Sequence, residues 1–171
     1  MALTAYLDES GTHGAQSRAV VVAAFAASAS RWAAYEAAYS ALLSSYGVGI
    51  LHAKDFRQRS GEFRGWSPAQ CATFNSVLLQ LSDQHLEFGC CSILRPEDYD
   101  LFYRTNLPRK ARPDRQYGLC FRMCLLGLVV LVQDGSGDFP INFVIESGHK
   151  NQADVMRIYD QLLNDPNMMV F

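Results

Sequence analysis

The sequence predicts a mixed α/β fold in which helices cover a central sheet. Two apolar runs near the N-terminus, residues 2–8 and 18–28, are separated by a turn that contains two glycines, and they are typical of paired strands. After them the chain alternates between helix-like and strand-like segments. With 171 residues, of which 49% are hydrophobic and 19% charged, the chain is long and apolar enough to fold as one domain over residues 1–171.

The first half contains the predicted central strand and the clearest helix. The run 18–28 is continuously apolar, which predicts a strand that is buried on both faces. Residues 30–46 are rich in alanine and carry their large side chains on one stripe, so we expect a helix with Ser30 as N-cap and Gly47 as the C′ residue. The following stretch I-L-H-A-K-D-F, residues 50–56, predicts a short strand or an extended piece.

The second half continues the alternation. Ser67 followed by Pro68 is typical of an N-cap and a first helical residue, which predicts a helix that ends near His85. Residues 86–94 alternate like a strand. Four further elements are predicted: a short acidic helix opened by Pro96, a largely buried helix over 115–132 that ends at the turn D-G-S-G-D, a strand over 140–148, and an amphipathic helix over 151–163.

The cysteines and the N-terminus indicate the compartment. The five cysteines form no C-x-x-C pair and lie within apolar runs, which favours reduced, buried thiols over disulfides or a zinc site. The N-terminus lacks the basic start of a signal peptide. The longest apolar segment, Leu119–Val132, is interrupted by Arg122 and is too short to span a bilayer. We therefore expect a cytoplasmic protein without a membrane partner.

Two predicted strands end in the same way. The first reads A-Y-L-D-E-S-G, with Asp8 and Glu9, and the later one reads F-V-I-E-S-G, with Glu146. If these strands are parallel neighbours, their carboxylates meet at the carboxyl edge of the sheet, where open α/β sheets bind ligands. Carboxylates that lie close together repel one another unless a cation lies between them, and a hard divalent ion such as Mg²⁺ or Mn²⁺ suits oxygen ligands. The pattern predicts a metal-dependent phosphoryl-transfer site.

Strand geometry separates the two adjacent carboxylates. Successive side chains of a strand point to opposite faces, so Asp8 and Glu9 cannot both face one metal while the strand stays regular. We expect Asp8 to be the ligand, and Glu9 to reach the metal only if the strand bends. The alternative is that both residues cap a turn that Ser10 and Gly11 complete.

Polar residues elsewhere supply further candidates. His52 is a candidate metal ligand, general base or phosphate contact, although a single histidine also fits a structural role. Asp55 is either a site residue or the cap of a short turn. The residues after Glu146, among them Lys150, can present a helix N-terminus to phosphate, and the alternative is ordinary capping by Asn151.

Net charge and charge distribution lead to different predictions about nucleic-acid binding. The net charge of −2 predicts no affinity for nucleic acid by itself. Eight of the fifteen Lys and Arg residues, however, fall in two loop-like stretches, residues 57–64 and 104–115. The first stretch is interleaved with aromatic residues, which suits phosphate contact and base stacking, and the alternative is a solvated loop whose aromatic side chains enter the core. The residues expected to contact nucleic acid are Arg57, Arg59, Arg64, Arg109, Lys110, Arg112 and Lys150.

Three motifs together resemble the domain-of-unknown-function 3800 family. They are Y-L-D-E-S-G at the start, L-H-A-K-D-F near residue 52 and I-E-S-G-H-K-N over 145–151. The resemblance implies a ribonuclease H-like three-layer fold, with a mixed five-stranded sheet, flanking helices and acidic strand ends that bind two divalent metals for nucleic-acid cleavage. Residue by residue, it implies Asp8 and Glu146 as metal ligands, with His52 and Asp55 close to the site.

The chain departs from that family at its C-terminus. Members usually continue into a segment in which an Ala-Asp pair on a helix supplies another acid, whereas this chain stops at N-M-M-V-F, residues 167–171. We expect either that the chain is shortened at this end or that the last carboxylate is absent.

The leading hypothesis is an enzyme, a Mg²⁺- or Mn²⁺-dependent nuclease that cleaves phosphodiester bonds in RNA or DNA. Asp8 and Glu146 would hold the metal, Glu9 and Asp55 would assist, and His52 would orient water or phosphate. The alternative is a catalytically inactive ribonuclease H-like domain that binds nucleic acid or has a regulatory role. A third reading is a metal-independent hydrolase with two carboxylates as acid and base, as in glycosidases.

Overall fold

The structure is a computed structural model, and it divides into two compact units. One unit combines Met1–Ala26 with Phe88–Phe171, and the other is Ala27–Glu87. The residues that the structure describes are 2–10, 18–107, 113–136, 139–146 and 151–164.

The first unit is built on an open, mixed sheet, whose four described strands have the order β3-β2-β1-β4. The strands are β1 (Leu3–Ser10), β2 (Val20–Ser28), β3 (Phe88–Leu94) and β4 (Ile141–Ile145). β2 pairs with β3 in antiparallel orientation, whereas β1 pairs with β4 in parallel. The predicted α/β class is confirmed, and so is the parallel pairing on which a meeting of the two strand ends depends.

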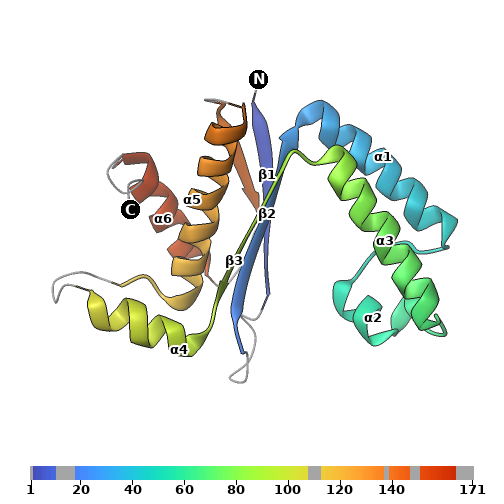
Figure 1. The fold of residues 1–171 in the computed structure, drawn as a ribbon, viewed down its shortest axis with the longest axis horizontal. Helices are drawn as coiled ribbons and strands as arrows, with labels where there is room; N and C mark the ends of the chain where they lie inside the picture. The colour runs from blue at the N-terminus through green and yellow to red at the C-terminus, as the bar shows by residue number, and fades with distance from the viewer. Residues whose placement is uncertain (1, 11–17, 108–112, 137–138, 147–150, 165–171) are drawn as a thin grey trace. The chain divides into compact units, whose positions relative to one another are not determined.

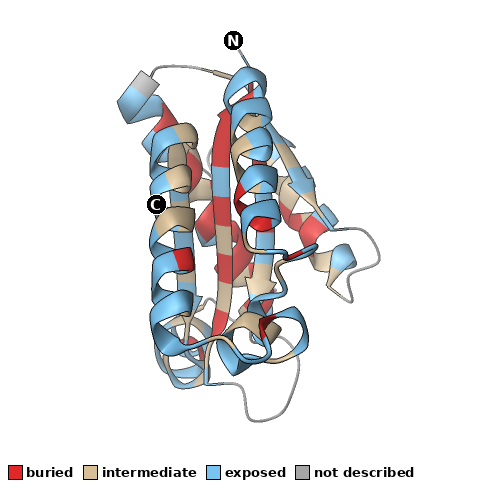
Figure 2. Cartoon of the chain, turned by 90° about the vertical axis from the view of Figure 1, so that its right-hand side faces the viewer, coloured by how far each residue is buried: buried red, intermediate tan, exposed pale blue. Residues whose placement is uncertain are grey.

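Two long helices cover one face of this sheet. They are α5 (Gln116–Ser136) and α6 (Gln152–Asn164), and both lie on the same side of the strands (Figure 1). Buried residues gather along the strands of the sheet (Figure 2). The core of the unit includes Ala5, Leu7, Val22, Phe121, Leu128 and Ile158.

Burial along β2 differs from the expectation of a strand covered on both faces. Its burial alternates through most of the strand, and Phe25 is exposed. The ring of Phe25 lies over Gly89, its register partner on β3. A Cβ atom at position 89 would lie 2.9 Å from Cε1 of that ring, so the glycine leaves the space that the ring fills.

This contact yields a first prediction. The Gly89→Val substitution is expected to lower the free energy of unfolding by about 1–3 kcal/mol, because the new side chain collides with the Phe25 ring. In a Phe25→Ala background the same substitution should cost much less. Urea denaturation of the four proteins of this mutant cycle measures both values, and equal costs in the two backgrounds would contradict the packing.

The second unit is helical. It contains α1 (Ala29–Ser45), α2 (Ala53–Gln58), η1 (Gly61–Phe63) and α3 (Pro68–His85). Its core joins α1 and α3 to an aromatic cluster, in which Phe63 and Phe74 are fully buried. The strand or extended piece predicted over residues 50–56 gives way to the short helix α2 from Ala53 onward, whereas His52 before it is extended. Phe56 of this helix packs against the aromatic cluster.

Element boundaries match the sequence best where caps are unambiguous. The Ser67 hydroxyl accepts a hydrogen bond from the Gln70 backbone N–H, and Oε1 of Gln70 accepts one from the Ser67 backbone N–H, which forms a capping box at the predicted start of α3. Helix α1 begins earlier than expected, with Ser28 rather than Ser30 as N-cap, whereas Gly47 has the predicted positive φ of 66° after its end.

The largest boundary error concerns α5. This helix continues through the expected D-G-S turn to Ser136, because its apolar face packs on the sheet along most of its length. Within the described residues, Gln116–Gly135 is long and apolar enough, by length and composition alone, to cross a membrane. A buried helix of a protein core meets the same criteria, and much of α5 lies in the core of the first unit.

The state of the cysteines agrees only in part with the prediction from the sequence. All five are free thiols, and Cys120 and Cys124 are buried between α5 and the sheet. Burial raises the pKa of both thiols, to about 12 for Cys124, so they remain protonated near neutral pH. Cys91 is exposed on β3, which corrects the expectation that every cysteine is buried.

Candidate functional site

The candidate site begins where β1 and β4 run side by side. Their register extends from Leu3 opposite Ile141 to Leu7 opposite Ile145, so the next residues along the two strands are Asp8 and Glu146. Paired residues of parallel strands present their side chains on the same face of a sheet. Asp8 and Glu146, which the sequence predicts as metal ligands, thus come directly after the last paired residues of two neighbouring parallel strands, at the carboxyl edge of the sheet.

These two carboxylates belong to the face of the sheet opposite α5 and α6. Tyr6 and Val144, the register pair two residues before them, are both exposed, whereas Leu7 is buried under the helices. Asp8 and Glu146 are exposed as well. Charged groups at this position keep much of their hydration and remain accessible to a ligand.

One oxygen of Asp8 is already engaged. Its Oδ1 accepts a hydrogen bond of 2.8 Å from the backbone N–H of Glu9. This contact corresponds in part to the turn-capping alternative, although β1 continues as a regular strand to Ser10. The second oxygen, Oδ2, is left to bind a cation or another donor.

Glu9 lies on the other face of the strand. Because β1 stays regular to Ser10, Glu9 follows Leu7 toward α5 rather than Asp8 toward the opposite face. Its neighbour there is Tyr117, in the first turn of α5. Burial raises the pKa of the Tyr117 phenol, and the negative charges of Glu9 and Asp8 raise it further. A phenol that stays neutral next to carboxylates remains a hydrogen-bond donor.

Tyr117 was missed by the sequence analysis. In the sequence it resembles the other apolar residues of a buried helix, and only its position in the first turn of that helix distinguishes it from them. The structure places it behind the strand end that carries Asp8 and Glu9, where it connects the acidic edge to the core.

The donor set fits a hydrated divalent ion. Asp8 and Glu146 offer carboxylate oxygens from neighbouring strands, and Mg²⁺ or Mn²⁺ commonly binds one or two carboxylates and retains several waters. Among the described residues there is no group of three or more His, Cys, Asp or Glu arranged to hold a metal. The predicted contact residue Lys150 lies outside the described residues, as does His149.

His52 and Asp55 belong to the helical unit. His52 is the exposed N-cap residue of α2, and its side chain makes no capping hydrogen bond. The Asp55 carboxylate accepts a 2.8 Å hydrogen bond from the hydroxyl of Ser60, which fixes the turn after α2. Asp55 therefore takes the turn-capping role that the sequence left open for it, and His52 keeps an available imidazole.

The first basic stretch lies on the surface of the helical unit. Lys54, Arg57, Arg59 and Arg64 are exposed, and none of them forms an ion pair with any residue that the structure describes. The acidic residues within this stretch point to backbone and hydroxyl groups instead: Glu62 accepts from the Gly49 N–H, and Asp55 from Ser60. Residues 54–64 carry four basic and two acidic side chains, so this surface has a local excess of positive charge.

The aromatic residues of that stretch follow the alternative prediction. Phe56, Phe63 and Trp66 pack on one another and on Phe74, with ring centroids 5.1–6.4 Å apart. Phe63 is fully buried and cannot stack on a base. The aromatic cluster instead gives a rigid support to the arginines around it.

The second basic stretch is described only at its ends. Arg109, Lys110 and Arg112 lie outside the described residues. Arg104 forms a surface ion pair with Asp100 at 3.2 Å, and the largely exposed Arg115 approaches Asp154 at 3.9 Å.

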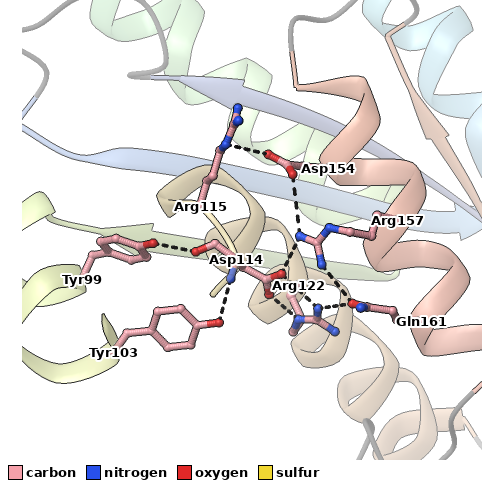
Figure 3. Close-up of polar contacts among 8 residues, drawn as sticks. All are labelled: Tyr99, Tyr103, Asp114, Arg115, Arg122, Asp154, Arg157 and Gln161. Atoms are coloured by element: carbon pink, nitrogen blue, oxygen red, sulfur yellow. Dashed lines mark hydrogen bonds and ion pairs between the residues drawn. The ribbon is translucent and has the colours of Figure 1, made fainter. Parts of the chain in front are cut away.

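A buried ionic cluster lies where α5 begins (Figure 3). Asp114 receives two hydrogen bonds from Arg122 of α5, at 2.7 and 3.2 Å, and one of 2.7 Å from Arg157 of α6. Gln161 accepts hydrogen bonds from both arginines. The Asp114 carbonyl accepts a hydrogen bond from the Tyr99 hydroxyl, and the Asp114 N–H donates one to the Tyr103 hydroxyl. Both tyrosines lie in η2 (Tyr99–Tyr103), which follows the short helix α4 (Pro96–Asp98).

This cluster was also missed by the sequence analysis. Its one signal was Arg122, a charge in the middle of an apolar helix, which requires a buried partner. Asp114 accepts hydrogen bonds from both arginines, whereas Nη1 of Arg122 and Nε of Arg157 are buried without a hydrogen-bond partner among the described residues. The contacts of Asp114 tie η2, α5 and α6 together. We therefore assign the cluster to the stability of the first unit rather than to chemistry.

A cavity of about 240 Å³ lies between α5, β4 and α6. Its lining is mostly apolar and includes Leu125, Val129, Phe143 and Leu162. Among the residues that the structure describes, no carboxylate, histidine or cysteine lines it, and we do not assign hydrolysis to it.

No protein-family model, curated protein or solved structure with which the chain was compared matches it. The resemblance to the domain-of-unknown-function 3800 family thus rests on the three sequence motifs.

Proposed function

We propose that the chain is a divalent-metal-dependent nuclease that cleaves phosphodiester bonds in RNA or DNA. The observation that supports the proposal is the parallel pairing of β1 with β4, whose last paired residues, Leu7 and Ile145, directly precede Asp8 and Glu146. Strand-end carboxylates of this kind are suited to a hard divalent cation, and the carboxyl edge is where α/β sheets bind ligands.

The proposed fold is ribonuclease H-like, in the domain-of-unknown-function 3800 family. Supporting it are the strand order β3-β2-β1-β4, the parallel pairing of β1 with β4 and the three quoted motifs. A fifth strand and a third layer complete the architecture in this proposal.

In the proposed reaction the residues of the chain have separate tasks. A bound Mg²⁺ or Mn²⁺ supplies Lewis-acid activation of the phosphodiester. Asp8 and Glu146 hold that ion, and Asp8 is kept in place by the hydrogen bond from the Glu9 N–H. Glu9 lies on the opposite face and acts with Tyr117 in supporting the strand end. Arg57, Arg59 and Arg64 bind the phosphate backbone.

The second candidate is a catalytically inactive domain that binds nucleic acid. It is favoured by one observation, the absence of a third acidic ligand near Asp8 and Glu146 within the described residues. Basic residues with no ion-pair partner would still attract phosphates in such a protein.

Cleavage and binding assays separate these functions. We expect the purified chain to cut labelled single- or double-stranded RNA or DNA in Mg²⁺ or Mn²⁺, and to lose this activity in excess EDTA. Binding without cleavage that weakens with salt would identify the inactive domain, because phosphate contacts release counterions. Cleavage that persists in EDTA would point to two carboxylates acting without metal. If the chain shows neither binding nor cleavage at any salt concentration, both candidates are rejected.

A further inference from the structure

Helix α5 carries a second apolar face besides the one that packs on the sheet. Leu119, Met123, Leu126 and Val130, here called the α5 stripe, follow one another at intervals of four, three and four residues and form one line along the helix. The residues that α5 buries in the core lie on the other side: Tyr117, Cys120, Phe121, Cys124 and Leu128.

The α5 stripe is accessible. Met123 is 48% exposed and Val130 52% exposed, and Leu119 and Leu126 are partly buried. The outward face of a helix in a globular protein is normally polar. An apolar line along a helix of 21 residues, about 30 Å long, therefore indicates a surface that a partner covers.

We propose that the α5 stripe pairs with the same stripe of a second copy of this chain, with the two helices antiparallel about a twofold axis. In this arrangement Leu119 lies opposite Val130 of the other copy, and Met123 lies opposite its Leu126. The interval of four, three and four residues is the one that lets two helices interlock side chains along a seam. A twofold interface has to be self-complementary. The α5 stripe meets this condition, because its apolar residues lie opposite apolar residues when the second copy is antiparallel.

The residues that flank the stripe support the antiparallel orientation. Gln116 before it and Gln133 after it would face each other across the seam, where their amide groups can exchange hydrogen bonds. Arg115 and Asp134 lie at opposite ends of α5. Antiparallel pairing brings these opposite charges to the same level, whereas parallel pairing would bring like charges together.

Both charged side chains are accessible for this role. The Arg115 side chain is 81% exposed, and its ion pair with Asp154 is long, at 3.9 Å. Asp134 is exposed and forms no ion pair within the part of the chain that the structure describes. Charges at both ends of the stripe, and a line only one residue wide, suit a second helix better than a lipid bilayer.

The Met123→Glu variant tests the seam. Sedimentation velocity over a wide range of protein concentration should show a monomer–dimer equilibrium for the unmodified chain, because one helix pair buries less than a standard interface of about 1,200–2,000 Å². Met123→Glu should weaken the dimer at least about tenfold, since it places a carboxylate against Leu126 of the other copy. The matched control is Met156→Glu on α6, where the methionine is equally accessible at 52% exposure, and it should leave the dimer unchanged.

A charge exchange tests the orientation and does not depend on the seam variant. Asp134→Arg alone should weaken the dimer at low ionic strength, and the double variant Arg115→Asp/Asp134→Arg should restore it. A monomer at every concentration, a Met123→Glu protein that dimerises like the unmodified chain, or a double variant no better than Asp134→Arg would overturn the proposal. The proposal would also be overturned if the chain is monomeric and co-floats with phosphatidylcholine–phosphatidylserine vesicles, and if Met123→Glu abolishes this co-flotation. The stripe would then be a membrane contact.

Discussion

Replacing Asp114 with asparagine is expected to lower the free energy of unfolding by about 3–5 kcal/mol. Asp114 is the only described carboxylate that contacts both Arg122 and Arg157, and the side chains of Asp114 and Arg122 are 4% and 7% exposed. Asparagine has nearly the same shape but no charge, so the buried guanidinium of Arg122 would keep its desolvation cost and lose its counterion.

The control for this experiment is Asp100→Asn. Asp100 pairs with Arg104 at the surface, where both side chains are more than 60% exposed, and an ion pair of this kind contributes less than about 1 kcal/mol. Thermal and urea denaturation of both variants give the comparison. Equal stability losses, or a loss below about 1 kcal/mol for Asp114→Asn, would show that the cluster does not hold η2, α5 and α6 together.

The same cluster sets the response to acid. Burial by itself would raise the pKa of Asp114, but the hydrogen bonds from Arg122 and Arg157 outweigh it, and the pKa is lower than in the unfolded chain. A group with a depressed pKa stabilises the fold above its unfolded pKa, near 4. This contribution is lost as the pH falls through the folded pKa. Stability measured from pH 6 downward should therefore fall more steeply for the unmodified chain than for Asp114→Asn.

The double variant Asp8→Asn/Glu146→Gln is expected to abolish both metal binding and cleavage. Both substitutions keep the size of the side chain and remove the negative charge that a divalent ion requires. Both residues are exposed, so the fold should tolerate the change. Mn²⁺ binding by calorimetry and Mg²⁺-dependent cleavage of labelled oligonucleotides measure the two losses.

Glu9→Gln is the matched control, one residue along the same strand. Glu9 lies on the opposite face, toward Tyr117, so this variant should still bind Mn²⁺. Metal-dependent cleavage that survives Asp8→Asn/Glu146→Gln would remove Asp8 and Glu146 from the site. Loss of Mn²⁺ binding in Glu9→Gln but not in Asp8→Asn would assign the metal to the other face.

The sequence predicted local structure best where side chains themselves define an element. The N-cap Ser67 with Pro68 located the start of α3, and Gly47 located the end of α1, because the capping contacts involve neighbouring residues. The stretch 50–56 was misassigned because its apolar start resembles a strand, whereas the contacts that decide its structure come from the aromatic cluster around Phe63 and Phe74. Such contacts join residues far apart in sequence.

The candidate site also separates what neighbouring residues determine from what depends on residues far apart in the sequence. Strand alternation predicts Asp8 and Glu9 on different faces, and β1 is a regular strand to Ser10. The repeated Glu-Ser-Gly pattern led to the prediction that β1 and the strand before Glu146 are parallel neighbours, and the pairing of β1 with β4 confirms it. Tyr117 and Asp114 were not found, because a tyrosine in an apolar helix and a single aspartate after a proline carry no periodic signal. Their roles depend on which side chains of other elements surround them.

A crystal structure with Mn²⁺ tests the central claim most directly. Anomalous scattering should show an ion bound by carboxylate oxygens of both Asp8 and Glu146, about 2.0–2.2 Å from each, with waters completing its coordination. An ion held by Glu9 on the face toward Tyr117, or no ion near Asp8 and Glu146 at saturating Mn²⁺, would contradict the account.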